Sequence, residues 1–176
     1  MPRCSGSVFG VTAALLVWAA GSAVAEVEDD FRLQRWEEAD VGFPVAPSEV
    51  DCLPFYVSAA TVNRFCVDAK SLSVGRDGVV RYTLMISAPS GVRNVSFEGM
   101  RCETREVRLY ALGQSDGSWS KSRGERWRRI SEAGANRHHA TLFLEHFCPD
   151  GVIVAQGDEA LANLRRGGRR SRNQIW

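Results

Sequence analysis

The stretch Val79–Ser87, with the sequence VVRYTLMIS, decides the fold class of this chain. Apolar and polar side chains alternate along it, and β-branched or aromatic residues are frequent. Because alternate residues of a strand point to opposite faces, the pattern predicts a half-buried strand of an antiparallel sheet. One face is expected to carry Val80, Tyr82, Leu84 and Ile86, and the other Arg81, Thr83 and Ser87.

Turn signals and further periodic segments surround this strand. Asp77-Gly78 predicts a tight turn before it, and Pro89-Ser90-Gly91 predicts one after it. Further strands are expected at 55–59, 64–68, 92–97 and 101–112, with strand-like chain at 119–130 and helices at 136–147 and 158–166. Because the strands precede the helices, we predict a single α+β domain with an antiparallel sheet and two C-terminal helices.

The first 25 residues have the layout of a secretory signal peptide. An apolar run at 11–20 is too short to span a membrane, and Ala23-Val24-Ala25 resembles a cleavage signature. We expect export of a mature protein that does not span the membrane. The expected division is a signal peptide at 1–25, an acidic segment and Pro-rich connector at 26–50 with a short helix around 30–38, the α+β domain at 51–168, and a basic disordered tail at 169–176.

Four cysteines remain after the predicted cleavage, namely Cys52, Cys66, Cys102 and Cys148. An even count in an exported chain favours two disulfides, and the sequence permits three pairings. We favour Cys52–Cys66, which closes a local loop, together with Cys102–Cys148, which links a central strand to a late helix. A CxxC redox pair is absent from the sequence.

The charge balance argues against nucleic acid as a partner. The full chain has 22 Lys and Arg against 21 Asp and Glu, and the predicted leader contains only Arg3, so the mature chain is neutral. Arginines at 123–129 and 165–172 could still contact phosphate-bearing envelope material.

The predicted strand 101–112 carries charge on both faces of its first half. Since a buried unpaired charge costs several kcal/mol, this half is expected either to form a charged edge or to line a polar site. Candidate binding residues are Arg101, Glu103, Arg105, Glu106 and Arg108, together with His138 and His139. A metal site using His139 and His146 is disfavoured, because a spacing of seven separates them by about 10.5 Å along a helix.

Three runs of sequence resemble a known bacterial family. They are DGVVRYT at 77–83, NVSFEGMRCETRE at 94–106 and NRHH at 136–139, and they are similar to the CNP-one-like family of exported Gram-negative proteins. The resemblance covers about 53–168 and implies a periplasmic address and a single domain. It implies no activity, so no catalytic or binding residue is carried over from it. Cys102 and Cys148 fall within the family-like motifs, which fits the favoured pairing.

These observations lead to two hypotheses of function. The first is a periplasmic binding or envelope-interaction protein that needs no cofactor and whose partner is an envelope protein or ligand. The second is a small hydrolase-like or metal-assisted enzyme that uses the stretch 98–108, beginning at Glu98, with His138 or His139 as acid or base. The second requires a histidine within hydrogen-bonding reach of Glu103 or Glu106 inside a pocket.

Overall fold

The computed structural model describes residues 36–124, 126–134 and 136–168. The expected signal peptide, the basic tail and most of the short helix expected around 30–38 therefore lie outside the described residues. The last three residues of that helix, Trp36 to Glu38, are described, and they are not helical. Among the described residues, no helix is long and apolar enough to cross a membrane.

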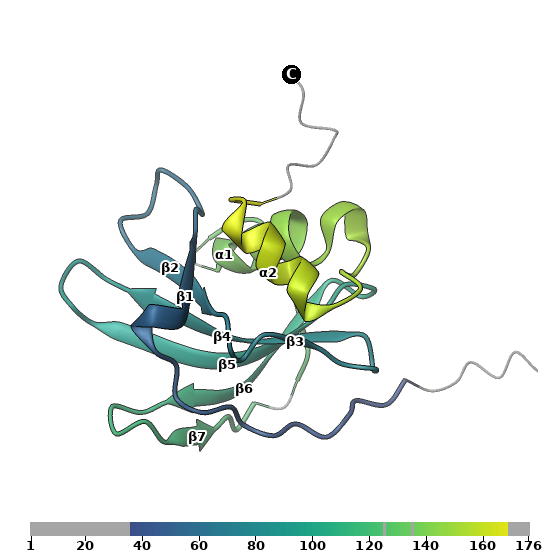
Figure 1. The fold of residues 1–176 in the computed structure, drawn as a ribbon, viewed down its shortest axis with the longest axis horizontal. Coiled ribbons are helices and arrows are strands. Elements are labelled where there is room, and N and C mark those ends of the chain that lie inside the picture. Colours follow the sequence, from purple (N-terminus) through teal and green to yellow (C-terminus); the bar gives the residue numbers. More distant parts are fainter. Residues whose placement is uncertain (1–35, 125, 135, 169–176) are drawn as a thin grey trace, which may run out of the picture. The chain divides into compact units, whose positions relative to one another are not determined.

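One antiparallel sheet forms the centre of the molecule (Figure 1). Its main strands run in the order β1-β2-β4-β5-β6-β7, while β3 pairs with β4 and β8 pairs with β6. The strands are β1 (Cys52–Phe55), β2 (Arg64–Asp68), β3 (Ser73–Val74), β4 (Val79–Ser87), β5 (Arg93–Arg101), β6 (Glu106–Gly113), β7 (Trp119–Lys121) and β8 (Arg128–Arg129). A single turn of 3₁₀-helix, η1 (Glu49–Asp51), precedes β1. The predicted antiparallel α+β fold is thus confirmed.

The helices follow the sheet in sequence and cover one of its faces. They are α1 (Arg137–Thr141), the π-helix η2 (Leu142–Phe147), the 3₁₀ turn η3 (Pro149–Gly151) and α2 (Gly157–Arg165). The single helix expected at 136–147 therefore changes from α to π geometry part-way along. Wider π-helical turns bury both Leu142 and Phe147 completely, so this segment closes the core over the sheet.

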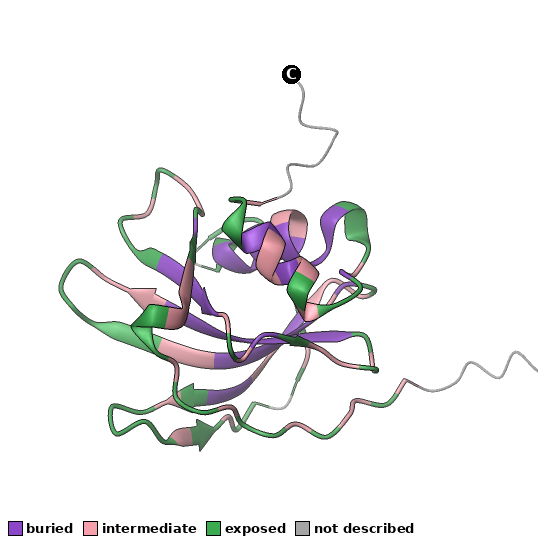
Figure 2. Ribbon diagram, viewed as in Figure 1, coloured by how far each residue is buried: buried purple, intermediate pink, exposed green. Residues whose placement is uncertain are grey.

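Strand β4 occupies the middle of the sheet, and the predicted alternation along it is confirmed. Val80, Tyr82 and Leu84 belong to the main core beneath the helices. Arg81 and Thr83, on the opposite face, are also buried, at 7% and 0% exposure. The expectation of a half-buried strand is therefore wrong, because β4 is buried on both faces (Figure 2). A second layer must therefore cover the other face of the sheet.

That second layer is the extended segment of residues 36–47, which we call the N-terminal segment. It crosses the sheet face opposite the helices, as Figure 1 shows. The Trp36 indole donates a hydrogen bond to the Asp77 carbonyl oxygen at 2.7 Å, and the Trp119 indole donates one to the Pro44 carbonyl oxygen at 2.7 Å. Val41 packs on a small apolar cluster formed by Phe97, Tyr110 and Ala111. Residues expected to be a connector thus form part of the folded body.

The predicted start of the strand at 101–112 is wrong. Strand β5 continues through Gly99 to Arg101, and the chain then reverses at 102–105 before β6 begins at Glu106. Arg105 adopts a positive φ of 54°, which ends the turn, and Arg101 pairs with Glu106 across it. The charges on both apparent faces are explained by this turn, because its side chains need not alternate.

Two disulfides hold the fold, and they follow the favoured pairing. Cys52 and Cys66 join the neighbouring strands β1 and β2, with a sequence separation of 14. Cys102 and Cys148 join the β5–β6 turn to the residue that follows η2, with a sequence separation of 46. Among the described residues, the second bridge is the only disulfide between the sheet side and the helical layer.

We expect the two bridges to contribute unequally to stability. In the chain-entropy treatment, removing the longer loop through the double variant Cys102→Ala and Cys148→Ala costs about 4 kcal/mol, whereas Cys52→Ala with Cys66→Ala costs about 3 kcal/mol. Urea unfolding of both double variants measures these losses. A larger loss from the shorter loop would contradict the expectation.

Candidate binding site

A buried carboxylate, that of Glu98, organises the interface between the sheet and α1. It lies opposite Tyr82 on the helix side of the sheet. The Tyr82 hydroxyl donates to Glu98 Oε2 at 2.9 Å, the Ser96 hydroxyl donates to Oε1 at 2.7 Å, and His139 Nε2 lies 2.8 Å from Oε2. The side chains of Glu98 and His139 are each 8% exposed, so this cluster is an interior one.

The polar partners keep Glu98 in its charged form. Burial alone would raise the pKa of Glu98, but the hydrogen bond and charge of His139 and the two hydroxyl donors outweigh it, so the pKa is lowered. Burial, together with the neighbouring Glu98 charge, raises the pKa of Tyr82 well above its usual value. The cluster therefore consists of an ionised carboxylate held by one imidazole and two neutral hydroxyls, and it fixes α1 on the sheet.

On the opposite face, Asp77 and Arg81 hold the start of the N-terminal segment. The Arg81 guanidinium donates to both Asp77 carboxylate oxygens, at 3.0 and 2.5 Å. Asp77 Oδ2 also accepts the Ala39 amide at 2.8 Å. Although burial would raise the pKa of Asp77, these donors lower it to about 2. The arrangement explains why Arg81 can be buried in a central strand.

Glu38 makes the next connection between the N-terminal segment and the sheet. Its carboxylate accepts hydrogen bonds from Arg108 and from the Tyr110 hydroxyl, both on β6. Burial and the hydrogen bond to Glu38 raise the pKa of Tyr110, so the phenol stays a donor. Gly99 makes this geometry possible, because a Cβ atom there would lie 2.3 Å from the Tyr110 hydroxyl oxygen.

A β-bulge gives Tyr110 its orientation. Phe97 pairs with Ala111 while Glu98 pairs with Leu109, so Tyr110 is the additional residue on β6. The extra residue places Tyr110 and Ala111 together in the apolar cluster on the side of the N-terminal segment.

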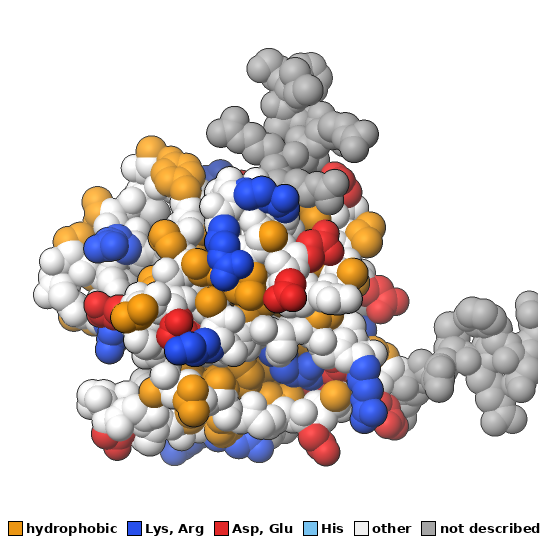
Figure 3. All heavy atoms as spheres, viewed as in Figure 1, with side chains coloured by type: hydrophobic (Ala, Val, Ile, Leu, Met, Phe, Trp, Pro, Cys, Tyr) orange, Lys and Arg blue, Asp and Glu red, His pale blue; other side chains and the backbone are white. Residues whose placement is uncertain are grey.

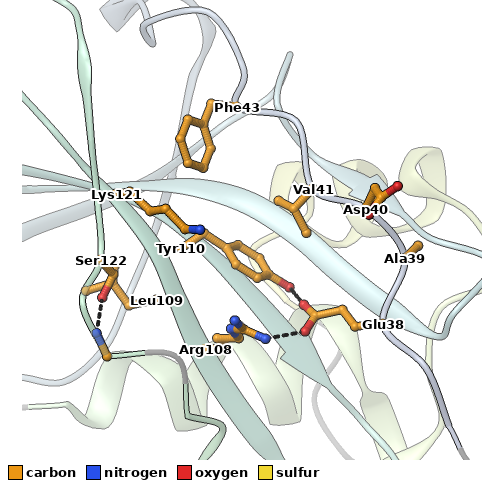
Figure 4. A pocket seen from close by; sticks show the side chains of 11 residues that line it. Glu38, Ala39, Asp40, Val41, Phe43, Arg108, Leu109, Tyr110, Lys121 and Ser122 are labelled. Carbon is orange, nitrogen blue, oxygen red and sulfur yellow. Dashed lines mark hydrogen bonds and ion pairs between the residues drawn. The ribbon is translucent and has the colours of Figure 1, made fainter.

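These residues form the floor of a pocket of about 450 Å³ between the N-terminal segment and strands β6 and β7. Figure 4 shows the Tyr110 ring at its centre, the Glu38 carboxylate and Arg108 at one side, and the Lys121 amine pointing inward from β7. Its lining contains Glu38, Ala39, Asp40, Val41, Phe43, Arg108, Leu109, Tyr110, Lys121, Ser122 and Gly124. The pocket thus combines aromatic surface with side chains of both charges.

A family model described as the CNP1-like family matches residues 32–165. The chain belongs to the CNP1-like family. The match includes the N-terminal segment, which walls the pocket, and it extends the resemblance seen in the sequence toward the N-terminus. No curated protein and no solved structure matches the chain.

Within this CNP1-like domain, the predicted charged residues do not converge on one site. Arg101 lies with its guanidinium carbon 3.6 Å from the centre of the Trp36 ring, and Arg108 binds Glu38. Both arginines therefore hold the N-terminal segment. Arg105 binds Glu132 beyond the turn. Glu103 and Glu106 each lie near Arg101, at 3.8 and 3.9 Å, and the Glu103 side chain is 83% exposed.

The histidines lie in the core, apart from the pocket. His139 binds Glu98, and His138 stacks on Phe65 with ring centres 5.4 Å apart. His146 packs edge-on against Phe55. Among the described residues, no three His, Cys, Asp or Glu side chains are placed to hold a metal ion. The carboxylate that binds His139 is that of Glu98. The enzymatic hypothesis required a histidine within reach of Glu103 or Glu106.

Sequence reasoning missed most of the residues that line the pocket. Of these, only Arg108 was a candidate. Glu38 appeared as one member of an acidic segment, and Tyr110 and Lys121 as ordinary members of strand-like chain. The one available signal was the presence of Arg81 in a strongly apolar strand, which requires a buried partner.

Stability should fall on mild acidification because of His146. Burial lowers the pKa of His146 from 6.5 to about 4, so between these values the unfolded chain binds a proton that the folded chain does not. From pH 7 to pH 4.5 this difference costs about 2 kcal/mol. His146→Phe, which keeps an aromatic ring at this site, should remove that part of the pH dependence in urea unfolding. An unchanged slope in the variant would contradict the assignment.

Loss of the Glu38 carboxylate should loosen the N-terminal segment. Glu38→Gln weakens charge-assisted hydrogen bonds to Arg108 and Tyr110, each worth about 1.5–3 kcal/mol. Hydrogen exchange at the Ala39 amide should therefore accelerate at least tenfold. The neighbouring substitution Glu37→Gln is the matched control, because Glu37 is exposed. Equal exchange in the two variants would show that Glu38 does not hold the segment.

Proposed function

We propose that this protein is a periplasmic binding module of the cell envelope that holds a small carboxylate-bearing ligand in the pocket beneath the N-terminal segment. The observation that carries the proposal is the pocket itself. Its volume of about 450 Å³ falls within the range of small-molecule sites, which are commonly about 300–1,000 Å³. The two disulfides and the leader-like first 25 residues support an address outside the cytoplasm.

The chemistry of the lining favours a ligand with an anionic group next to an apolar part. Arg108 and Lys121 contribute positive charge, while Tyr110 and Phe43 contribute aromatic surface. Guanidinium and ammonium groups are the usual donors to carboxylates. Glu38 already accepts from Arg108 and Tyr110, so it fixes these two side chains in place and lowers the cost of ordering them on binding.

The position of the histidines also supports binding over catalysis. General acid–base chemistry requires the acting group to come within hydrogen-bonding reach of the substrate. His139 and Glu98 lie in the core on the helix side of the sheet, while the pocket lies on the side of the N-terminal segment. A ligand in the pocket is therefore separated from this pair by the sheet.

The sequence offers a direct test, because Lys70 and Lys121 are its only lysines. Reductive methylation with ¹³C-formaldehyde would give each lysine an NMR signal, and Lys70→Arg and Lys121→Arg would assign them. N-acetyl amino acids with apolar side chains are the probes, and their amides, which lack the carboxylate, are the controls. We expect the acids to shift the Lys121 signal and to leave that of Lys70, which pairs with Asp51, unchanged.

Arg108→Gln should weaken binding of the active probe by about tenfold, since it removes a charged donor from the pocket. Arg76→Gln, an exposed arginine outside the pocket lining, is the matched control. If no acid moves the Lys121 signal, or if both lysine signals move together, the proposed pocket function is wrong.

A further inference from the structure

We propose that one end of the sheet docks on the surface of an anionic phospholipid bilayer. This end, which we call the loop end, consists of the β1–β2 loop (56–63), the β4–β5 loop (88–92) and the flanking arginines Arg64, Arg93 and Arg137. The inference needs neither the pocket described above nor its ligand.

Strand register brings the two loops to the same end of the sheet. Arg64 at the start of β2 pairs with Ser87 at the end of β4, and Ser87 also pairs with Arg93 at the start of β5. Both loops therefore project from the same end of the sheet, as Figure 1 shows.

Both loops are uncharged, and each carries exposed apolar side chains. Neither 56–63 nor 88–92 contains Asp, Glu, Lys or Arg. Tyr56, Val62 and Val92 are 73%, 78% and 59% exposed, respectively. Figure 3 shows hydrophobic side chains at the tip of the β1–β2 loop. Exposing three large apolar side chains on neighbouring tips is unfavourable in water, and tyrosine is enriched at membrane interfaces.

Arginines surround these tips. Arg64 and Arg93 flank Ser87 across three strands and line a pocket of about 180 Å³ with it. Arg137 lies beside the β1–β2 loop, where it lines a second pocket with Val57 and Ile86. Glu49, which binds Arg93 at 3.0 Å, is the one acidic residue lining either pocket. The loop end therefore has a net positive charge behind an uncharged apolar tip.

This order of groups matches the order of groups in a bilayer. Apolar tips can enter the interface while guanidinium groups stay at the level of the phosphates. A protein partner fits less well, because stable protein interfaces bury about 800 Å² per partner on matched surfaces, whereas these residues are carried on two projecting loops. The charge and the shape of the loop end together favour a lipid surface.

Vesicle flotation of the purified protein tests the proposal. Vesicles of phosphatidylcholine mixed with phosphatidylglycerol should bind the protein, and pure phosphatidylcholine should bind it more weakly. Val62→Ser should lower the partition coefficient about fivefold. Val152→Ser is the matched control, because Val152 is 67% exposed on the helical side and should leave binding unchanged.

The electrostatic contribution is tested separately. Arg64→Gln combined with Arg93→Gln should lower partitioning to the anionic vesicles by about 25-fold, at about fivefold per arginine, and added salt should have the same direction of effect. Arg76→Gln, at the turn between β3 and β4, is the control for a general charge effect. Circular dichroism verifies that each variant is folded.

Three results would overturn the proposal. One is absence of binding to both kinds of vesicle. Another is binding that Val62→Ser and Val152→Ser reduce equally. A third is loss of an envelope protein from the Val62→Ser variant while vesicle binding stays unchanged, which would identify the loop end as a protein interface. None of these results bears on the lysine NMR experiment, so failure here and failure of the pocket function are distinguishable.

Discussion

The attachment of the N-terminal segment through Glu38 is the interaction on which the second face of the sheet depends. One carboxylate accepts hydrogen bonds from Arg108 and Tyr110 and also lies 3.8 Å from Arg81. Without it, Arg81 and Arg108 would lose the carboxylate that they share on this face of the sheet. The Glu38 contacts hold the N-terminal segment over the sheet, and a pocket lies between this segment and strands β6 and β7.

Each face of the sheet carries buried carboxylates, and the groups that bind them differ between the two faces. On the helix side, Glu98 is held by hydrogen bonds to His139 and two hydroxyls, and large apolar side chains fill the remaining space. On the other side, Asp77 and Glu38 are neutralised by arginines, and the cover is an extended chain instead of a helix. An extended chain fills less volume than a helix, and a hollow lined by polar groups remains between this segment and strands β6 and β7.

Local signals in the sequence predicted the sheet, the helical tail and both disulfides. The alternation along β4 follows from backbone geometry, and the cysteine pairing from their even number and position. The turn at 102–105 was not predictable in this way, because it depends on a positive φ at Arg105, a residue type that seldom adopts one. The pocket depends on contacts such as Glu38 with Arg108, which are 70 residues apart and leave no trace in spacing.

The path of the N-terminal segment has a consequence for the order in which the molecule is completed. A chain is synthesised from its first residue onward, so residues 36–44 are made before any strand of the sheet exists. Their partners on β6 and β7 follow some 70 residues later. The N-terminal segment is therefore synthesised well before the strands that hold it, and any growing chain must pass through a period in which its side chains lack the partners that they contact in the folded protein.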